Sequence, residues 1–175
     1  LGHYAVNIFY NILEDDYLKT LKERTLELTE KDTMKHSTNV KANMTAYEKM
    51  VDDPIYDTFK KTVLSFFNAA LVLRTPHIDV PKFYFYELWG MKFNKGQRTL
   101  VHNHMGANWS GVFCIDTDKN AAQINFPEMD HAENMIPNSL YLFPGMMLHS
   151  TNPYLGKNPR VAVSFNLMTS QTKVV

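Results

Sequence analysis

The feature that most constrains the fold is a change of pattern at Lys82. From there to Met168 the chain consists of short apolar or aromatic segments of strand length, separated by residues typical of turns. Regularly spaced short strands are typical of a sandwich, jelly roll or barrel. The expected strands span residues 83–93, 98–102, 109–116, 122–126, 139–143, 147–151 and 160–168.

The N-terminal part follows a pattern that predicts helices. One helix is expected over residues 15–31, where leucines recur at near-helical spacing among charged residues. A second is expected after Asp53, which can cap a helix, with Pro54 in its first turn and Thr75-Pro76 as its end. The polar stretch 33–45 between them predicts a loop and is a candidate substrate lid.

Charge and cysteine content exclude several classes of protein. Lys plus Arg and Asp plus Glu both number 18, so no basic excess points to nucleic acid as a partner. The single cysteine, Cys114, excludes an intramolecular disulfide and fits a reducing compartment. No apolar run approaches the roughly 18–20 residues that cross a bilayer, so no membrane partner is expected. We therefore expect a cytoplasmic globular protein.

Three histidines are spaced so that two strands can offer them to one metal ion. His102 and His104 lie two residues apart on one expected strand or at its end, so their side chains point to the same face. His149 follows much later, on the strand after the Pro144-Gly145 turn. Such a set can hold a metal and leave other coordination positions open. A His-x-His pair alone is more often structural, so the surrounding sequence decides.

Arg160 begins the apolar strand that follows His149. By alternation Arg160, Ala162, Ser164 and Asn166 share one face of that strand. An arginine that points into a barrel is costly unless it meets an anion, and its planar guanidinium suits a carboxylate. A surface arginine at the start of a strand is the alternative, and the residues alone leave both open.

Three stretches carry a resemblance to a known family. They are HNHMGANWSGVFCID at 102–116, LYLFPGMMLHSTNP at 140–153 and RVAVSFN at 160–166. With the tryptophan of YELWG at 86–90, they resemble the 2-oxoglutarate- and Fe(II)-dependent oxygenases, specifically a small group from bacteria and phages. The resemblance covers about half of the chain, roughly residues 83–168, and the helical first part adds no motif.

The resemblance implies a mainly β fold class. The expected architecture is a double-stranded β-helix, a jelly roll of cupin-like form, with N-terminal helices packed on one sheet. The length of the chain fits a single domain over residues 1–175. Within it a mostly helical bracing segment, 1–81, supports a jelly-roll core, 82–170.

The resemblance also implies the cofactors, Fe(II) and the co-substrate 2-oxoglutarate. His102, His104 and His149 match the metal ligands, and Arg160 matches the residue that pairs with the far carboxylate of the co-substrate. The family's Arg-x-Ser pair is Arg160-Val161-Ala162 here. The hydroxyl that helps to hold the carboxylate is therefore expected from elsewhere, and the further candidates for co-substrate binding are Ser164, Tyr141, Asn166, Tyr84 and Tyr86.

His104 is a departure from the wider superfamily, which usually has Asp or Glu at this position. Three imidazoles would equally suit zinc or a cupin-type metal site. If His104 were instead the first ligand, Gly106 would stand at the second position, the His-x-Gly pattern of iron halogenases. Metal identity and reaction type therefore stay open at this point.

The main hypothesis is an enzyme, a dioxygenase of the oxidoreductase class. It would hydroxylate a C–H bond of a small molecule or of a prolyl or other peptide side chain, using dioxygen and converting 2-oxoglutarate to succinate. One alternative is a non-catalytic jelly-roll binding or virion-type module. Another is a cupin-like metalloenzyme that needs no oxo acid.

Overall fold

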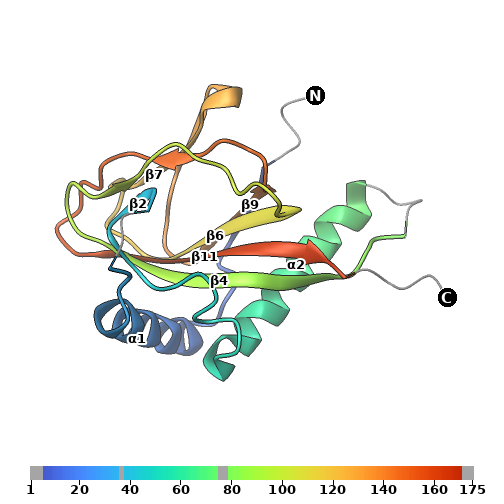
Figure 1. Ribbon diagram of the computed structural model, residues 1–175, viewed down its shortest axis with the longest axis horizontal. Helices are drawn as coiled ribbons and strands as arrows, with labels where there is room; N and C mark the ends of the chain where they lie inside the picture. The colour runs from blue at the N-terminus through green and yellow to red at the C-terminus, as the bar shows by residue number, and fades with distance from the viewer. Residues whose placement is uncertain (1–5, 36–37, 75–78, 171–175) are drawn as a thin grey trace.

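The computed structural model describes residues 6–35, 38–74 and 79–170 and has three layers (Figure 1). Helices α1 (Asp15–Lys31) and α2 (Asp57–Arg74) cover one face of a large sheet, and shorter strands lie over the other face. The expectation of a mainly β fold with helices on one sheet is confirmed. None of the helices in the described ranges is long and apolar enough to cross a membrane.

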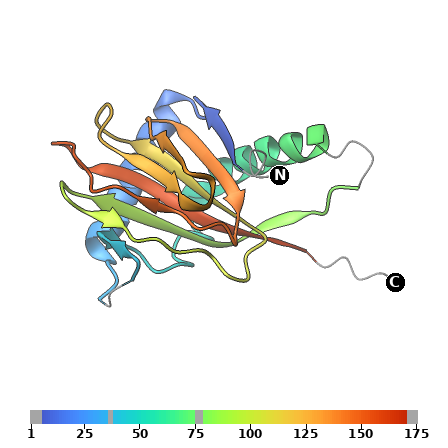
Figure 2. The same cartoon turned by 90° about the horizontal axis from the view of Figure 1, so that it is seen from above.

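The large sheet is antiparallel and has the strand order β1-β9-β6-β11-β4-β3. Seen from above, β11 lies between β4 and β6 (Figure 2), and its eight residues from Arg160 to Leu167 are all buried. The strands are β1 (Asn7–Tyr10), β9 (Ser139–Pro144), β6 (Trp109–Asp116), β11 (Arg160–Thr169), β4 (Phe83–Phe93) and β3 (Asn43–Met44).

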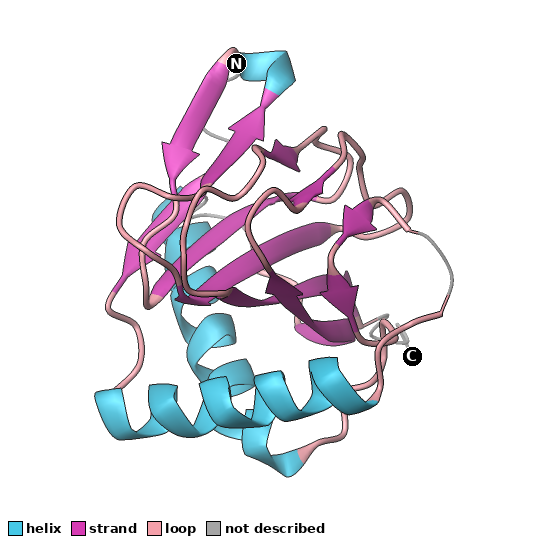
Figure 3. Cartoon of the chain, turned by 90° about the vertical axis from the view of Figure 1, so that its left-hand side faces the viewer, coloured by secondary structure: helices cyan, strands magenta, loops and turns pink. Residues whose placement is uncertain are grey.

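The opposite layer consists of shorter strands, with the helices on the far side of the large sheet (Figure 3). One small sheet has the order β10-β7-β8, and β2 pairs with β5 beside it. Beyond these strands, His102 and His149 form an isolated antiparallel bridge, so the segment that follows β5 pairs with the segment that precedes β10. The strands are β2 (Val40–Lys41), β5 (Arg98–Thr99), β7 (Gln123–Phe126), β8 (His131–Asn134) and β10 (Ser150–Thr151).

Alternation along the central strand separates two apolar cores. Val161, Val163 and Phe165 of β11 pack toward the helices, in a cluster that includes Phe59 and Phe67 of α2. The other face of β11 looks into the space between the two layers of strands, where a second cluster forms. The predicted alternation from Arg160 is therefore confirmed, and it directs the polar members of this strand to the barrel interior.

The elements differ from the sequence prediction mainly at their ends. The helix over 15–31 and the strands β4 and β6 have the predicted bounds. Asp53 accepts a hydrogen bond from the N–H of Ile55 and caps a short 3₁₀ turn (Pro54–Tyr56), and α2 follows directly at Asp57. The predicted helix end at Thr75-Pro76 lies outside the described residues.

Four strands were not predicted. The stretch 33–45, expected to be a loop, contains β2 and β3, and β1 adds a strand to the edge of the large sheet through pairing with β9. The N-terminal segment therefore contributes strands as well as helices. β8 is the fourth. Its side chains are mostly exposed, so its polar sequence HAEN shows no apolar pattern that would predict a strand.

Candidate metal centre

Two of the three histidines stand on segments that pair as antiparallel strands. His102 and His149 face each other across the isolated bridge. Nδ1 of His102 lies 2.8 Å from the carbonyl O of Leu100, and Nδ1 of His149 lies 3.0 Å from that of Met147. When each Nδ1–H donates to its carbonyl, the Nε2 lone pair of each ring is free to bind a metal.

His104 reaches the same point from a turn. Its N–H donates to the carbonyl O of Gly145 at 2.7 Å, and its own carbonyl accepts the N–H of Ala107 at 3.1 Å. Gly106 in this turn has a φ of +99°, a conformation that favours glycine. Gly145 allows the turn to approach closely, because a Cβ there would lie 2.3 Å from the carbonyl O of Ala107.

The three side chains converge into one donor set. A ring nitrogen from each lies within 4.8 Å of the others, and they form the candidate metal-binding group among the described residues. Burial is the largest cause lowering the pKa of all three rings, to about 3 for His104 and about 4 for His149. The imidazoles are therefore neutral at pH 7, the form that binds a metal.

Arg160 is a buried cation without an anionic partner. It is 2% exposed, and its guanidinium carbon lies 3.8 Å from the centre of the Phe93 ring. Nη1 donates to Sδ of Met135 at 2.9 Å, whereas Nε has no hydrogen-bond partner. Burial lowers its pKa to about 10, which leaves it charged at pH 7. No carboxylate in the described parts of the chain pairs with it, so an anion bound here would relieve a large desolvation cost.

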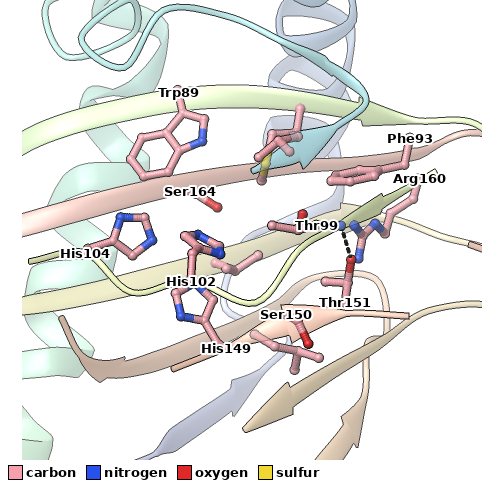
Figure 4. Close-up of a pocket in the computed structure, with 14 residues that line it drawn as sticks. Trp89, Phe93, Thr99, His102, His104, His149, Ser150, Thr151, Arg160 and Ser164 are labelled. Carbon is pink, nitrogen blue, oxygen red and sulfur yellow. Dashed lines mark hydrogen bonds between the residues drawn. The ribbon is translucent and has the colours of Figure 1, made fainter. Parts of the chain in front are cut away.

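One pocket connects the histidines with Arg160 (Figure 4). Its enclosed volume is about 30 Å³, and about 380 Å³ when all the empty space out to its open mouth is counted. The histidines lie at one end with Trp89 and Ser164 beside them, and Arg160 and Phe93 lie at the other end. Nε1 of Trp89 is a second buried donor without a partner. The other lining residues are Val40, Met91, Thr99, Val112, Ile124, Ser150 and Thr151.

The predicted site residues are only partly brought together. Arg160 and Ser164 line the pocket with the three histidines. Asn166 and Tyr86 line a neighbouring cavity, which also includes His104. The side-chain nitrogen of Asn166 lies 3.3 Å from Nδ1 of His104, so Asn166 contacts a predicted ligand rather than the pocket near Arg160.

Tyr141 and Tyr84 do not reach this pocket. Tyr141 shares the inward face of β9 with Phe143, but its hydroxyl donates to the carbonyl O of Asn134 at 2.9 Å and accepts from the N–H of Ile136. Tyr84 is 46% exposed and lines neither cavity. Strand parity indicated the face of Tyr141 correctly, but not its position along the strand.

Two hydroxyl side chains that the sequence did not predict as site residues lie beside Arg160. Figure 4 shows Thr99 and Thr151 next to the guanidinium, and the Thr151 hydroxyl accepts the N–H of Thr99 at 2.9 Å. Their strands, β5 and β10, are only two residues long. The sequence carried no signal for this pair, because antiparallel register continued from the His102–His149 bridge would place Thr99 opposite Asn152 rather than Thr151.

No family model matches this sequence, and no curated protein matches it. Solved structures do match over nearly the whole chain. A viral collagen prolyl hydroxylase from Paramecium bursaria Chlorella virus-1, in complex with 2-oxoglutarate, is 13% identical, with a TM-score of 0.71 over 97% of this chain and 98% of that one. A prolyl-4-hydroxylase from Pseudomonas putida is 11% identical, with a TM-score of 0.72 over 97% and 95%.

A third match has a different activity. SnoN, an α-ketoglutarate-dependent epimerase of nogalamycin biosynthesis, was solved with Fe³⁺, α-ketoglutarate and a nogalamycin compound. It is 8% identical, with a TM-score of 0.71 over 94% of this chain and 79% of that one. At these identities the likeness is one of fold. The chain therefore has the double-stranded β-helix fold found in 2-oxoglutarate- and iron-dependent oxygenases.

Proposed function

We propose that this protein is a 2-oxoglutarate- and Fe(II)-dependent oxygenase that hydroxylates a C–H bond of a small molecule or peptide. One observation carries the proposal. A three-histidine donor set and a buried arginine without an anion lie at opposite ends of the same pocket.

The donor set fits iron. His102, His104 and His149 would hold the ion through neutral imidazole nitrogens, and the remaining coordination positions would be left for ligands. The backbone carbonyls of Leu100 and Met147 hold two of the rings in the tautomer that leaves Nε2 free. When bound, iron with 2-oxoglutarate supplies oxidation of a C–H bond by dioxygen, coupled to decarboxylation of the oxo acid to succinate.

The other end of the pocket has donor groups suited to the far carboxylate of a dicarboxylate. Arg160 would pair with the far carboxylate of 2-oxoglutarate, because its buried Nε–H needs an acceptor. Ser164, Thr99 and Thr151 offer hydroxyl groups in the same walls. Nε1 of Trp89 is a further donor that has no acceptor within the protein. The roles of these residues are to bind and orient the co-substrate and to exclude water from it.

A cupin-like metalloenzyme without an oxo-acid co-substrate is the second candidate. The observation that favours it is the all-histidine donor set, which lacks the carboxylate usual in the wider superfamily. This candidate leaves the unpaired Arg160 without a role. A non-catalytic binding module whose histidines hold a structural metal would likewise leave Arg160 without a role.

Anaerobic spectroscopy tests the proposal directly. Fe(II) and 2-oxoglutarate added together should give a weak visible band near about 500 nm, as expected for iron chelated by an oxo acid. Fe(II) alone should not give this band. In air, the loaded protein should convert 2-oxoglutarate to succinate, a product that the cupin-like alternative would not form. Absence of both the band and succinate would overturn the proposal.

A further inference from the structure

A second cavity borders His104 and is distinct from the Arg160 pocket. Its volume is about 490 Å³, and about 910 Å³ when all the empty space out to solvent is counted. His104 is the one residue that lines both cavities, so the second cavity borders the candidate metal centre. Its lining residues are Tyr47, Tyr86, Glu87, Asn103, His104, Met105, Gly106, Ala107, Asn166 and Met168.

A β-bulge in β4 shapes this cavity. Asn166 of β11 pairs with Glu87, but the next residue, Leu167, pairs with Phe85, so Tyr86 is an extra residue in β4. In a regular strand Tyr86 and Glu87 would point to opposite faces. The bulge allows both side chains to line the same cavity.

Glu87 gives the cavity its charge. It is the only Asp, Glu, Lys or Arg in the lining. Its Oε2 accepts a hydrogen bond from the side-chain nitrogen of Asn166, and no lysine or arginine of the described residues pairs with it. Tyr47 has its pKa raised by burial and, next, by the negative charge of Glu87. The carboxylate therefore acts on the cavity without a cation to balance it.

Aromatic and thioether groups surround this carboxylate. The ring of Tyr47 packs edge-on against Trp89 with centroids 5.1 Å apart, while Tyr86 is 57% exposed beside Glu87. Met105 is 80% exposed at the border of the cavity. A carboxylate with tyrosine rings beside it favours an organic cation, through ion pairing and cation–π contact.

We propose that this cavity binds the substrate and selects one that carries an ammonium or guanidinium group, held by Glu87 and the rings of Tyr47 and Tyr86. That this ligand is the substrate rests on the function proposed above. Glu87 is the one charged side chain that lines this cavity, so it is the group there that can pair with a cation. An anionic ligand would be repelled, and a neutral one would gain nothing from Glu87.

The test is a binding comparison on the full chain without iron. The probes are N-acetyl-lysine N-methylamide, the corresponding arginine compound, and a neutral lysine analogue with a hydroxyl in place of the ammonium group. Binding is followed by NMR of ¹³C-methyl methionine, since Met105 and Met168 line the cavity. We expect the cationic probes to bind at least about 10-fold more tightly than the neutral one, and less tightly at high salt.

Two variants separate charge from shape. Glu87→Gln keeps an oxygen that can accept from Asn166 but should remove the preference for the cationic probes. Glu23→Gln makes the same change at an exposed position on α1 and should leave the preference intact. Equal binding of charged and neutral probes, no detectable binding of the cationic ones, or a preference that survives Glu87→Gln would each overturn the proposal.

The outcome is independent of the proposed enzymatic activity. If the cationic probes bind through Glu87 but the iron-loaded protein forms no succinate, the cation site stands and the oxygenase proposal fails. If succinate forms but no cationic probe binds, the reverse holds. Stimulation of succinate formation by the lysine probe in the wild type, lost in Glu87→Gln, would connect the two.

Discussion

His102 and His149 are hydrogen-bonded to each other through their backbones in both directions. The N–H of His102 donates to the carbonyl O of His149 at 3.1 Å, and the N–H of His149 donates to that of His102 at 2.9 Å. Their ring centroids lie 4.3 Å apart. The separation of these two side chains is therefore set by strand pairing. His104, by contrast, depends on a turn that docks on Gly145.

Removal of one paired histidine should abolish metal binding while the fold remains. His149→Ala leaves two imidazoles, so we expect Fe(II) affinity to fall by at least about 100-fold. Anaerobic calorimetry and metal analysis measure the loss, and circular dichroism measures the fold. His131→Ala is the matched control, because His131 is exposed and pairs with Glu133 away from the site. Stoichiometric iron in His149→Ala would show that the donor set is wrong.

Arg160→Met should weaken 2-oxoglutarate binding without lowering the stability of the fold. Loss of the guanidinium should weaken 2-oxoglutarate binding by at least about 50-fold and leave metal affinity nearly unchanged. Because Arg160 is a buried charge without an anion, the free energy of unfolding should stay equal or rise, by about 1–3 kcal/mol. Urea denaturation of the ligand-free protein measures this. A marked loss of stability would mean that Arg160 is a structural residue.

Arg160→Lys is the companion variant for the same position. Lysine keeps a positive charge but lacks the planar fork that binds a carboxylate through two nitrogens. We expect intermediate 2-oxoglutarate affinity, between those of the wild type and Arg160→Met. Equal affinity in all three proteins, measured by titration of the band of the iron complex, would remove Arg160 from the site.

Stability of the metal-free protein should fall as the pH decreases below about 6.5. Burial lowers the pKa of His104 to about 3 and of His149 to about 4. Between these values and the ordinary pKa of 6.5 the unfolded chain binds more protons than the folded one. The free energy of unfolding therefore rises with pH through this window and is flat above it, with a slope of at most about 1.4 kcal/mol per pH unit for each histidine.

Urea midpoints at about pH 7.5 and about pH 5.5 measure this slope. The double variant His104→Asn, His149→Asn lacks both titrating rings, so its midpoint should change less between the two conditions. An equal change in both proteins would assign the pH dependence to other groups.

The sequence predicted the inner framework of the fold better than its periphery. β4, β6 and β11 are long and apolar, and they are buried at the middle of the large sheet, so composition and alternation are strong there. β1 and β3 are short edge strands, and β8 is polar and largely exposed. Burial imposes little pattern on such strands, and their pairing depends on partners far away in the sequence.

The candidate site was predictable where alternation alone decides direction. The inward face of Arg160 and Ser164 follows from strand parity. The convergence of His102 and His104 was also predicted, but His104 owes its direction to a turn rather than to strand alternation. The place of Tyr86 was not predictable, because a bulge in β4 changes the direction of neighbouring side chains. Sequence patterns do not reveal a single extra residue in a strand.

Gly145→Ala should damage the metal centre through His104 alone. A Cβ at this position would lie 2.3 Å from the carbonyl O of Ala107, which is backbone and has little freedom to move aside, so the turn that carries His104 must shift. We expect Fe(II) affinity to fall by about 10- to 100-fold, as when a group that orients a ligand is lost, while the bridge between His102 and His149 persists.

Gly96→Ala is the control. Gly96 has a positive φ, +83°, which Gly145 does not, but it has open space around its Cβ position, so this change should cost about 1–2 kcal/mol of stability and leave metal affinity unchanged. Unchanged metal affinity in Gly145→Ala would show that His104 does not bind the ion and that His102 and His149 hold it with other ligands.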